Sequence, residues 1–171
     1  RLDDSIEIDR VAFVPGELLS LFFWGTGRQT LKLDAKILGF DFKNQAPEIA
    51  LAYYLAGLWR NRAHNGSYAD ALKASTLLER ARISLDEARP GRARERLEKS
   101  LDTLRDAGII ASWRYESWSL GNAPARGWAE SWLTAKIAIT PALQIVTYYA
   151  ENIDREQAPA LEAAPLSPLN E

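Results

Sequence analysis

Two arginines and a lysine recur along one stretch of the sequence with a spacing that suits recognition of a nucleic acid. Arg92 and Arg96 are four residues apart, about one helical turn, and Lys99 follows three residues later. An arginine can engage both acceptors that guanine offers in the major groove of DNA, whereas a lysine is better suited to a phosphate. This spacing predicts arginines that read base edges and a lysine that holds the backbone.

Further polar residues complete the expected set of DNA contacts. Free backbone amides near Arg89, at the expected start of a helix, would receive a phosphate. Ser100 and Thr103 would contact a phosphate or a thymine methyl group. Additional backbone contacts are expected from Arg62, Ser75 and Thr76.

The residue types that the chain lacks exclude most catalytic chemistry. Its 171 residues include no cysteine and a single histidine, His64. Without cysteine there are no disulfides, thiolate nucleophiles or Cys-ligated metal sites, and one histidine does not favour a Ser-His-Asp triad. We therefore expect no catalytic residue, no metal and no cofactor, and a protein that is not an enzyme.

The net charge argues against a nucleic-acid binder only when it is taken over the whole chain. The sequence has 21 Lys+Arg against 23 Asp+Glu, a formal charge of −2. Between Leu58 and Lys136, however, there are 14 basic and 10 acidic residues, which gives this segment a net charge of +4. The acidic ends therefore conceal a basic middle that would attract phosphates.

Two helices are predicted ahead of the basic stretch. The first covers residues 47–62, is strongly apolar and has a proline at N1, where a helix tolerates it. The second runs from Ser75 or Thr76 to Ile83, with Glu79 three residues after Thr76 completing a capping box. These helices would support the one that carries Arg92 and its neighbours.

A third helix is predicted over about residues 90–107. Leu97, Leu101 and Leu104 follow the i, i+4, i+7 spacing of a buried helix face, and Gly108 marks the end. This helix would place the basic stretch on a rigid element.

A helical wheel sorts the charges of the third helix. With Leu97 at zero, Arg92, Arg96, Lys99 and Thr103 fall between roughly 200° and 260°, toward solvent. A separate ribbon collects the acidic residues Glu95, Glu98, Asp102 and Asp106. The alternative is an ordinary solvated face, whose acids and bases form i, i+3 and i, i+4 pairs.

After the third helix, apolar and polar residues alternate with a period of two, which predicts a β-hairpin. Residues 109–116 and 128–139 are the expected strands, and residues 118–127 have the composition of a long loop. Arg126 near the tip would enter a minor groove or meet a phosphate, and Arg114 on the first strand would add a backbone contact.

The ends of the chain are expected to contribute less. Residues 1–46 are predicted to form a strand-and-turn appendage in which residues 31–34 alternate as a half-buried strand. Residues 142–152 predict a closing amphipathic helix, and residues 154–171 an acidic, proline-containing disordered tail. No run reaches the roughly 18 apolar residues of a membrane span, so a cytoplasmic protein is expected.

The order of these elements resembles a winged helix-turn-helix domain over residues 47–140, within a domain expected to cover residues 47–153. The resemblance is carried by Ser75-Thr76-Leu77-Leu78-Glu79, Arg92-Ala93-Arg94-Glu95-Arg96-Leu97, Leu101 to Ile110 and Trp113-Arg114-Tyr115. The chain is similar to plasmid-type replication initiators and related regulators. The resemblance implies a mostly helical α+β fold, a recognition helix and a wing at about residues 117–127.

The same resemblance implies double-stranded DNA as the partner. It further implies a role in replication initiation or transcription regulation, as a homodimer or within a larger nucleoprotein assembly. The setting would be a bacterial-type cytoplasm, associated with the nucleoid or a plasmid. The alternative function is a protein-interaction module, in which Trp118 and Trp128 near the loop dock a partner, since tryptophan is enriched at interfaces.

Overall fold

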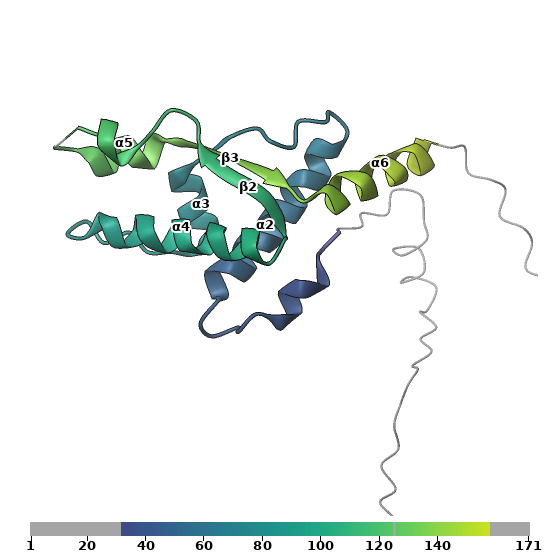
Figure 1. Cartoon of the computed structure of the whole chain (residues 1–171), viewed down its shortest axis with the longest axis horizontal. Helices are drawn as coiled ribbons and strands as arrows, with labels where there is room; N and C mark the ends of the chain where they lie inside the picture. The colour runs from purple at the N-terminus through teal and green to yellow at the C-terminus, as the bar shows by residue number, and fades with distance from the viewer. Residues whose placement is uncertain (1–31, 125, 158–171) are drawn as a thin grey trace, which may run out of the picture. The chain divides into compact units, whose positions relative to one another are not determined.

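The computed structural model describes residues 32–124 and 126–157, and these form an α+β fold with five α-helices and a small antiparallel sheet (Figure 1). The elements in chain order are η1 (Ala35–Gly39), α2 (Ala46–Ala63), β1 (Leu72–Lys73), α3 (Ala74–Ala81), α4 (Pro90–Asp106), β2 (Ile110–Tyr115), η2 (Leu120–Asn122), α5 (Trp128–Thr134), β3 (Lys136–Pro141) and α6 (Leu143–Gln157).

Helix α2 is the central helix of the core, as its apolar sequence predicts. Leu51, Leu55 and Trp59 are almost fully buried on it, and the helix packs against α3, α4 and α6. Pro47 lies in its first turn, where the missing backbone N–H costs no hydrogen bond. The preceding turn is ordered by Asp41, whose carboxylate accepts the backbone N–H of Lys43 at 2.8 Å, and this bond lowers the pKa of Asp41.

Helix α3 forms where expected, but its predicted capping box does not. The N-cap is Lys73, which makes no side-chain capping bond, so Ser75 and Thr76 lie inside the first turn. The backbone of Ala74 instead donates to the carbonyl of Ala135 at 2.9 Å. A tertiary contact therefore satisfies the start of α3 in place of the local cap.

Helix α4 has the buried face that its leucine spacing predicts. Leu97, Leu101 and Leu104 are fully buried. The helix ends at Asp106, and Gly108 just after the C-cap has a left-handed φ of +71°. The following amide of Ile109 donates back to the carbonyl of Leu104 at 2.9 Å. This is the usual way in which a glycine closes a helix C-terminus.

The three strands pair in the order β1-β3-β2, with β3 in the middle. Trp113 pairs with Ile139 and Tyr115 pairs with Ile137, so these four side chains share the face of the sheet that packs on the helices. The first strand of the predicted hairpin is confirmed as β2.

The second predicted strand is only partly correct. Its first half, Trp128–Thr134, is the helix α5, and only the later part enters β3. Gly127, with a φ of +75°, precedes the helix, and Trp132 is buried at its centre. Burial of one large side chain has outweighed the strand-like alternation of this short segment.

The ends of the described region also differ from the expectations. Residues 32–34 form no strand, and Ile37 of η1 is buried in the core. Residues 32–46 therefore contribute to the same hydrophobic core as the helices that follow, through Ile37. Helix α6 forms as predicted and continues to Gln157. The remaining expectations for residues 1–31 and 158–171 lie outside the described residues.

Candidate nucleic-acid interface

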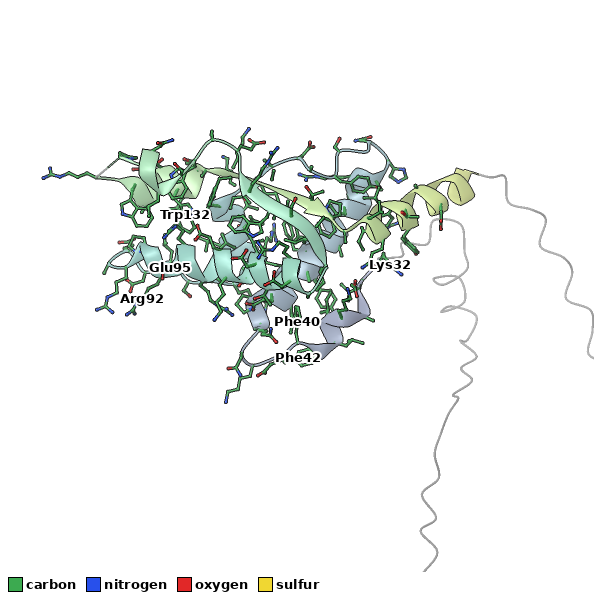
Figure 2. All side chains as sticks on the ribbon, viewed as in Figure 1. Lys32, Phe40, Phe42, Arg92, Glu95 and Trp132 are labelled. Atoms are coloured by element: carbon green, nitrogen blue, oxygen red, sulfur yellow. The ribbon has the colours of Figure 1, made fainter. Side chains whose placement is uncertain are left out.

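The exposed arc of α4 presents Arg92 and Lys99 to solvent. Both are exposed, and neither side chain has a hydrogen bond or ion pair to any other described residue. Arg92 lies in the first turn, beside Glu95 (Figure 2). Arg89, the N-cap residue, is also exposed. These three cations lie where the sequence places them, along the start and the outer side of the helix.

Ion pairs with the i, i+3 and i, i+4 spacing of a solvated helix face do form on α4, but between residues other than Arg92 and Lys99. The ion pairs on α4 involve Arg94 with Glu98 at 3.2 Å and Arg105 with Asp102 at 2.7 Å. Thr103 is partly exposed, and its hydroxyl donates to the carbonyl of Lys99 at 2.9 Å. Because the acids pair with other arginines, they leave Arg92 and Lys99 uncompensated.

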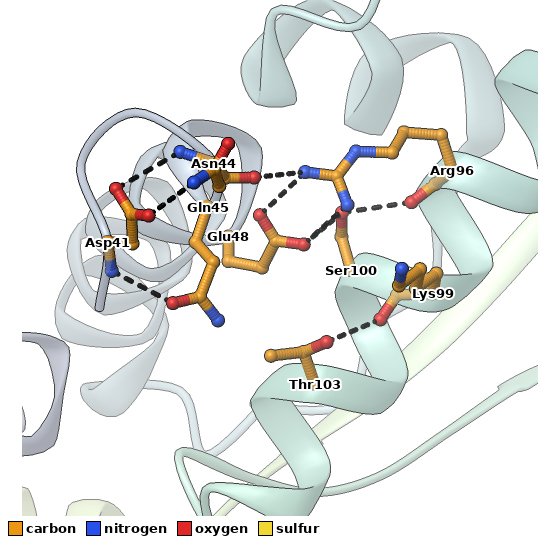
Figure 3. A network of polar contacts seen from close by, with 8 residues as sticks. All are labelled: Asp41, Asn44, Gln45, Glu48, Arg96, Lys99, Ser100 and Thr103. Atoms are coloured by element: carbon orange, nitrogen blue, oxygen red, sulfur yellow. Dashed lines mark hydrogen bonds and ion pairs between the residues drawn. The ribbon is translucent and has the colours of Figure 1, made fainter. Parts of the chain in front are cut away.

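Arg96 is not a free base-reading side chain, which corrects the prediction from the wheel. Its Nη1 donates to Oε1 of Glu48 at 2.9 Å, and its Nη2 donates to Oε2 at 3.0 Å (Figure 3). Nη2 also donates to the carbonyl of Asn44 at 3.1 Å. Both terminal nitrogens of the guanidinium are thus occupied by α2 and the turn before it.

Ser100 is likewise unavailable to DNA, which corrects a second prediction. The residue is fully buried, and its hydroxyl lies 3.0 Å from Oε1 of Glu48 and 2.9 Å from the carbonyl of Arg96. Glu48 itself is 1% exposed. A buried carboxylate requires such partners, and Arg96 and Ser100 supply them.

Two residues of the acidic ribbon of α4, Glu98 and Asp102, bond to the sheet. The hydroxyl of Tyr115 donates to Oε1 of Glu98 at 3.0 Å, and the indole N–H of Trp113 donates to Oδ1 of Asp102 at 3.0 Å. The indole N–H of Trp132 in turn donates to the Tyr115 oxygen at 2.8 Å. Burial raises the pKa of Tyr115, so the phenol stays neutral and continues to donate.

Strand β2 and the segment between β2 and β3 hold the remaining predicted contacts. Arg126 is exposed just before α5, and Arg114 is exposed on β2. Trp118 and Trp128 are only partly exposed and pack against the core, and the centroid of the Trp118 ring lies 5.0 Å from that of the Tyr115 ring. Neither tryptophan projects as a free docking anchor.

The DNA contacts predicted around α3 come from residues on two different helices, α2 and α3. Ser75 is exposed and Thr76 is partly exposed on that helix. Arg62 donates from Nη1 to the carbonyl of Asp70 at 2.8 Å, which ties the end of α2 to the following loop. His64 is the exposed C-cap residue of α2.

Burial of Glu48 is the feature that the sequence reasoning missed. Its partners lie 48 and 52 residues away, so no local spacing marks it. The helical wheel of α4 contains one indication of this contact. Arg96 at about 260° lies beside Ser100 at about 300°, and both are at the margin of the buried face. A position at that margin has one side open to a neighbouring helix.

Comparison with known proteins found no matching family model, curated protein or solved structure. Among the described residues, no three His, Cys, Asp or Glu side chains are grouped so as to hold a metal ion. No helix in residues 32–157 is both long and apolar enough to cross a membrane.

Proposed function

We propose that this chain binds double-stranded DNA with α4 as the recognition helix. The observation that carries the proposal is the division of the cations on α4. Arg94, Arg96 and Arg105 are ion-paired, whereas Arg92 and Lys99 are exposed and free of partners among the described residues. Phosphates and base edges require such uncompensated cations on an accessible helix face.

The order of the elements supports the same proposal. Helix α2, strand β1, helices α3 and α4 and strands β2 and β3 follow one another in the order of a winged helix, with β3 central in the sheet. In helix-turn-helix proteins the second helix of the motif, here α4, enters the major groove with its N-terminal residues toward the bases. Figure 1 shows that the start of α4 and the α5 segment lie at the same end of the described region.

The proposed roles follow from position and chemistry. Arg92, in the first turn of α4, reads a base edge, and Lys99, two turns further along, holds a phosphate. Arg89 neutralises a phosphate at the helix start, and Arg126 contacts the backbone or minor groove from the wing. We place this activity in replication initiation or transcription regulation, in a cytoplasmic nucleoprotein assembly or homodimer.

A selection from random duplexes tests the proposal. The purified protein should enrich a duplex sequence, and its affinity for that duplex should fall steeply as salt rises, because binding releases condensed counterions. The Arg92→Ala variant should relax the sequence preference at one position while keeping the fold. Failure of the unchanged protein to bind any duplex at low salt would overturn the proposal.

A further inference from the structure

The face of the sheet turned away from α4 carries its own cations. Lys73 on β1 pairs directly with Lys136 on β3, and both are exposed. The flanking Ile137 is buried on the opposite face, as strand alternation requires. Arg114 pairs with Ala138, two residues along β3 from Lys136, and so lies on the same face as both lysines.

Like charges directly opposite each other in a sheet are destabilising. No ion pair to either lysine, or to Arg114, is formed by any residue that the structure describes. Glu116 continues β2 beside Lys136, and its backbone N–H donates to the Lys136 carbonyl at 3.0 Å, yet its carboxylate forms no ion pair with the lysine. The repulsion between Lys73 and Lys136 is therefore not relieved by an ion pair within the described part of the chain, and Glu116 is the acid that shares their face.

A polar cavity of about 400 Å³ continues this basic face at the start of β3. Lys136 belongs to both the face and the cavity lining. The other polar lining residues carry hydroxyl or amide groups, namely Ser117, Ser119, Asn122, Ser131 and Thr134. None of the described residues that line the cavity carries a carboxylate. An ammonium group among neutral donors suits an anion with several acceptor oxygens, such as a phosphodiester.

This basic face cannot share a straight duplex with α4. Trp113 and Tyr115 bond to α4 from one side of β2, so Arg114 between them is directed to the other side of the sheet. A nucleic acid that lies along the exposed arc of α4 is therefore separated from Lys73 and Lys136 by the sheet itself.

We propose that Lys73, Lys136 and Arg114, with the adjoining polar cavity, bind the phosphate backbone of a second nucleic-acid segment. The inference rests on the proposed function, because it assumes that α4 holds the first segment. The chain then bridges two segments of DNA, with sequence read at α4 and the backbone held at the sheet. Phosphate binding gives the adjacent placement of the two lysines a function.

A bridging assay tests the inference. One duplex is immobilised on beads, the protein is added, and capture of a second, fluorescent duplex is measured. The variants are K73Q/K136Q on the sheet and R92Q/K99Q on α4. The matched control is K36Q/K43Q, which removes two exposed lysines outside both surfaces. Thermal unfolding of each variant is measured in parallel.

We expect K73Q/K136Q to lower capture of the second duplex at least tenfold while raising Tm, because the substitution removes the like-charge pair. In a protein that already carries R92Q/K99Q, replacement of Lys73 and Lys136 should lower the slope of log affinity against log salt concentration by about 2. The control should leave capture unchanged. A loss of binding together with a gain in stability cannot result from unfolding.

Other outcomes would overturn one proposal or both. Capture that persists in K73Q/K136Q but is lost in R92Q/K99Q would mean that two copies bridge through α4, and would overturn this inference alone. Binding of anionic lipid vesicles through the lysines, with duplex capture unaffected, would also overturn it. Absence of any duplex binding by the unchanged protein would overturn the proposed function and the inference with it.

Discussion

Arg96 and Glu48 form a bidentate ion pair between two helices, with Nη1–Oε1 and Nη2–Oε2 distances of 2.9 and 3.0 Å. The Glu48 side chain is 1% exposed and that of Arg96 is 31% exposed. Removal of one partner from such a pair leaves a buried charge without compensation. The pair therefore fixes the first turn of α2 against the middle of α4.

The Arg96→Ala variant should lose about 3 kcal/mol or more of unfolding free energy, because the buried Glu48 carboxylate loses its charged partner. Urea denaturation measures this. Arg92→Ala is the control on the same helix, and it should change stability by less than about 0.5 kcal/mol because it has no described partner. The double variant E48L/R96M should recover most of the loss. Equal stability of the Arg96→Ala and Arg92→Ala proteins would contradict the role given to the pair.

Arg92 and Lys99 should differ in how they affect DNA binding. Arg92→Ala should cost roughly 1 to 3 kcal/mol on the selected duplex and relax the preference at one position, because a base contact is lost. Lys99→Ala should weaken binding to all duplexes alike and reduce the salt slope by about 1. Fluorescence anisotropy over a salt series separates the two. Identical effects on selected and random duplexes for both variants would count against base reading by Arg92.

Tyr115 should contribute stability through its place between Trp132 and Glu98. Tyr115→Phe removes the oxygen that accepts the Trp132 indole N–H and leaves that buried donor unpaired. The expected loss is about 1–3 kcal/mol in chemical denaturation. Tyr53→Phe is the control, because Tyr53 is exposed and forms no hydrogen bond with a described residue. A loss no larger than that of the control would show that the network adds nothing.

The same tyrosine should give a signature at alkaline pH. Burial raises the pKa of Tyr115 above the ordinary value of 10, so the unfolded chain ionises at this position before the folded protein does. The stability contribution is complete below about pH 10 and is lost as pH rises toward the folded pKa. Tm measured from pH 8 to pH 11 should therefore fall less steeply in Tyr115→Phe. An unchanged alkaline slope would place the titration elsewhere.

Gly108 should be intolerant of a side chain. Its φ of +71° is left-handed, and an added Cβ would lie 3.1 Å from Nζ of Lys36. Gly108→Ala should cost about 1–2 kcal/mol, mainly from the backbone, because the lysine end can move. Gly57→Ala, in the middle of α2 with open space around it, should instead stabilise by up to about 1 kcal/mol. Differential scanning calorimetry of the two variants should give Tm shifts of opposite sign.

The longer helices could be predicted because their signal is local and repeated. Leu97, Leu101 and Leu104 repeat at the helical period, and the structure buries all three. Segment Trp128–Thr134 is only seven residues long, and over that length alternation and helical period are hard to tell apart. Its helix depends on burial of Trp132, whose bonding partner is 17 residues away.

The candidate site was predictable only where its residues act through their own helix. Arg92 and Lys99 are exposed because no residue within 32–124 or 126–157 packs over that part of α4, and the wheel identifies this arc. Arg96 and Ser100 lie at its margin, where the fate of a side chain depends on whether a distant segment covers it. Here the first turn of α2 does so through Glu48.

Helix α4 is held on two sides, by Glu48 of α2 through Arg96 and by Trp113 and Tyr115 of β2 through Asp102 and Glu98. Two attachments at different angles around one cylinder remove its freedom to roll about its own axis. The direction in which Arg92 and Lys99 project is then set before any ligand arrives. A duplex that docks there need not spend binding free energy on orienting the helix, so that more of the contact energy remains to discriminate between sequences.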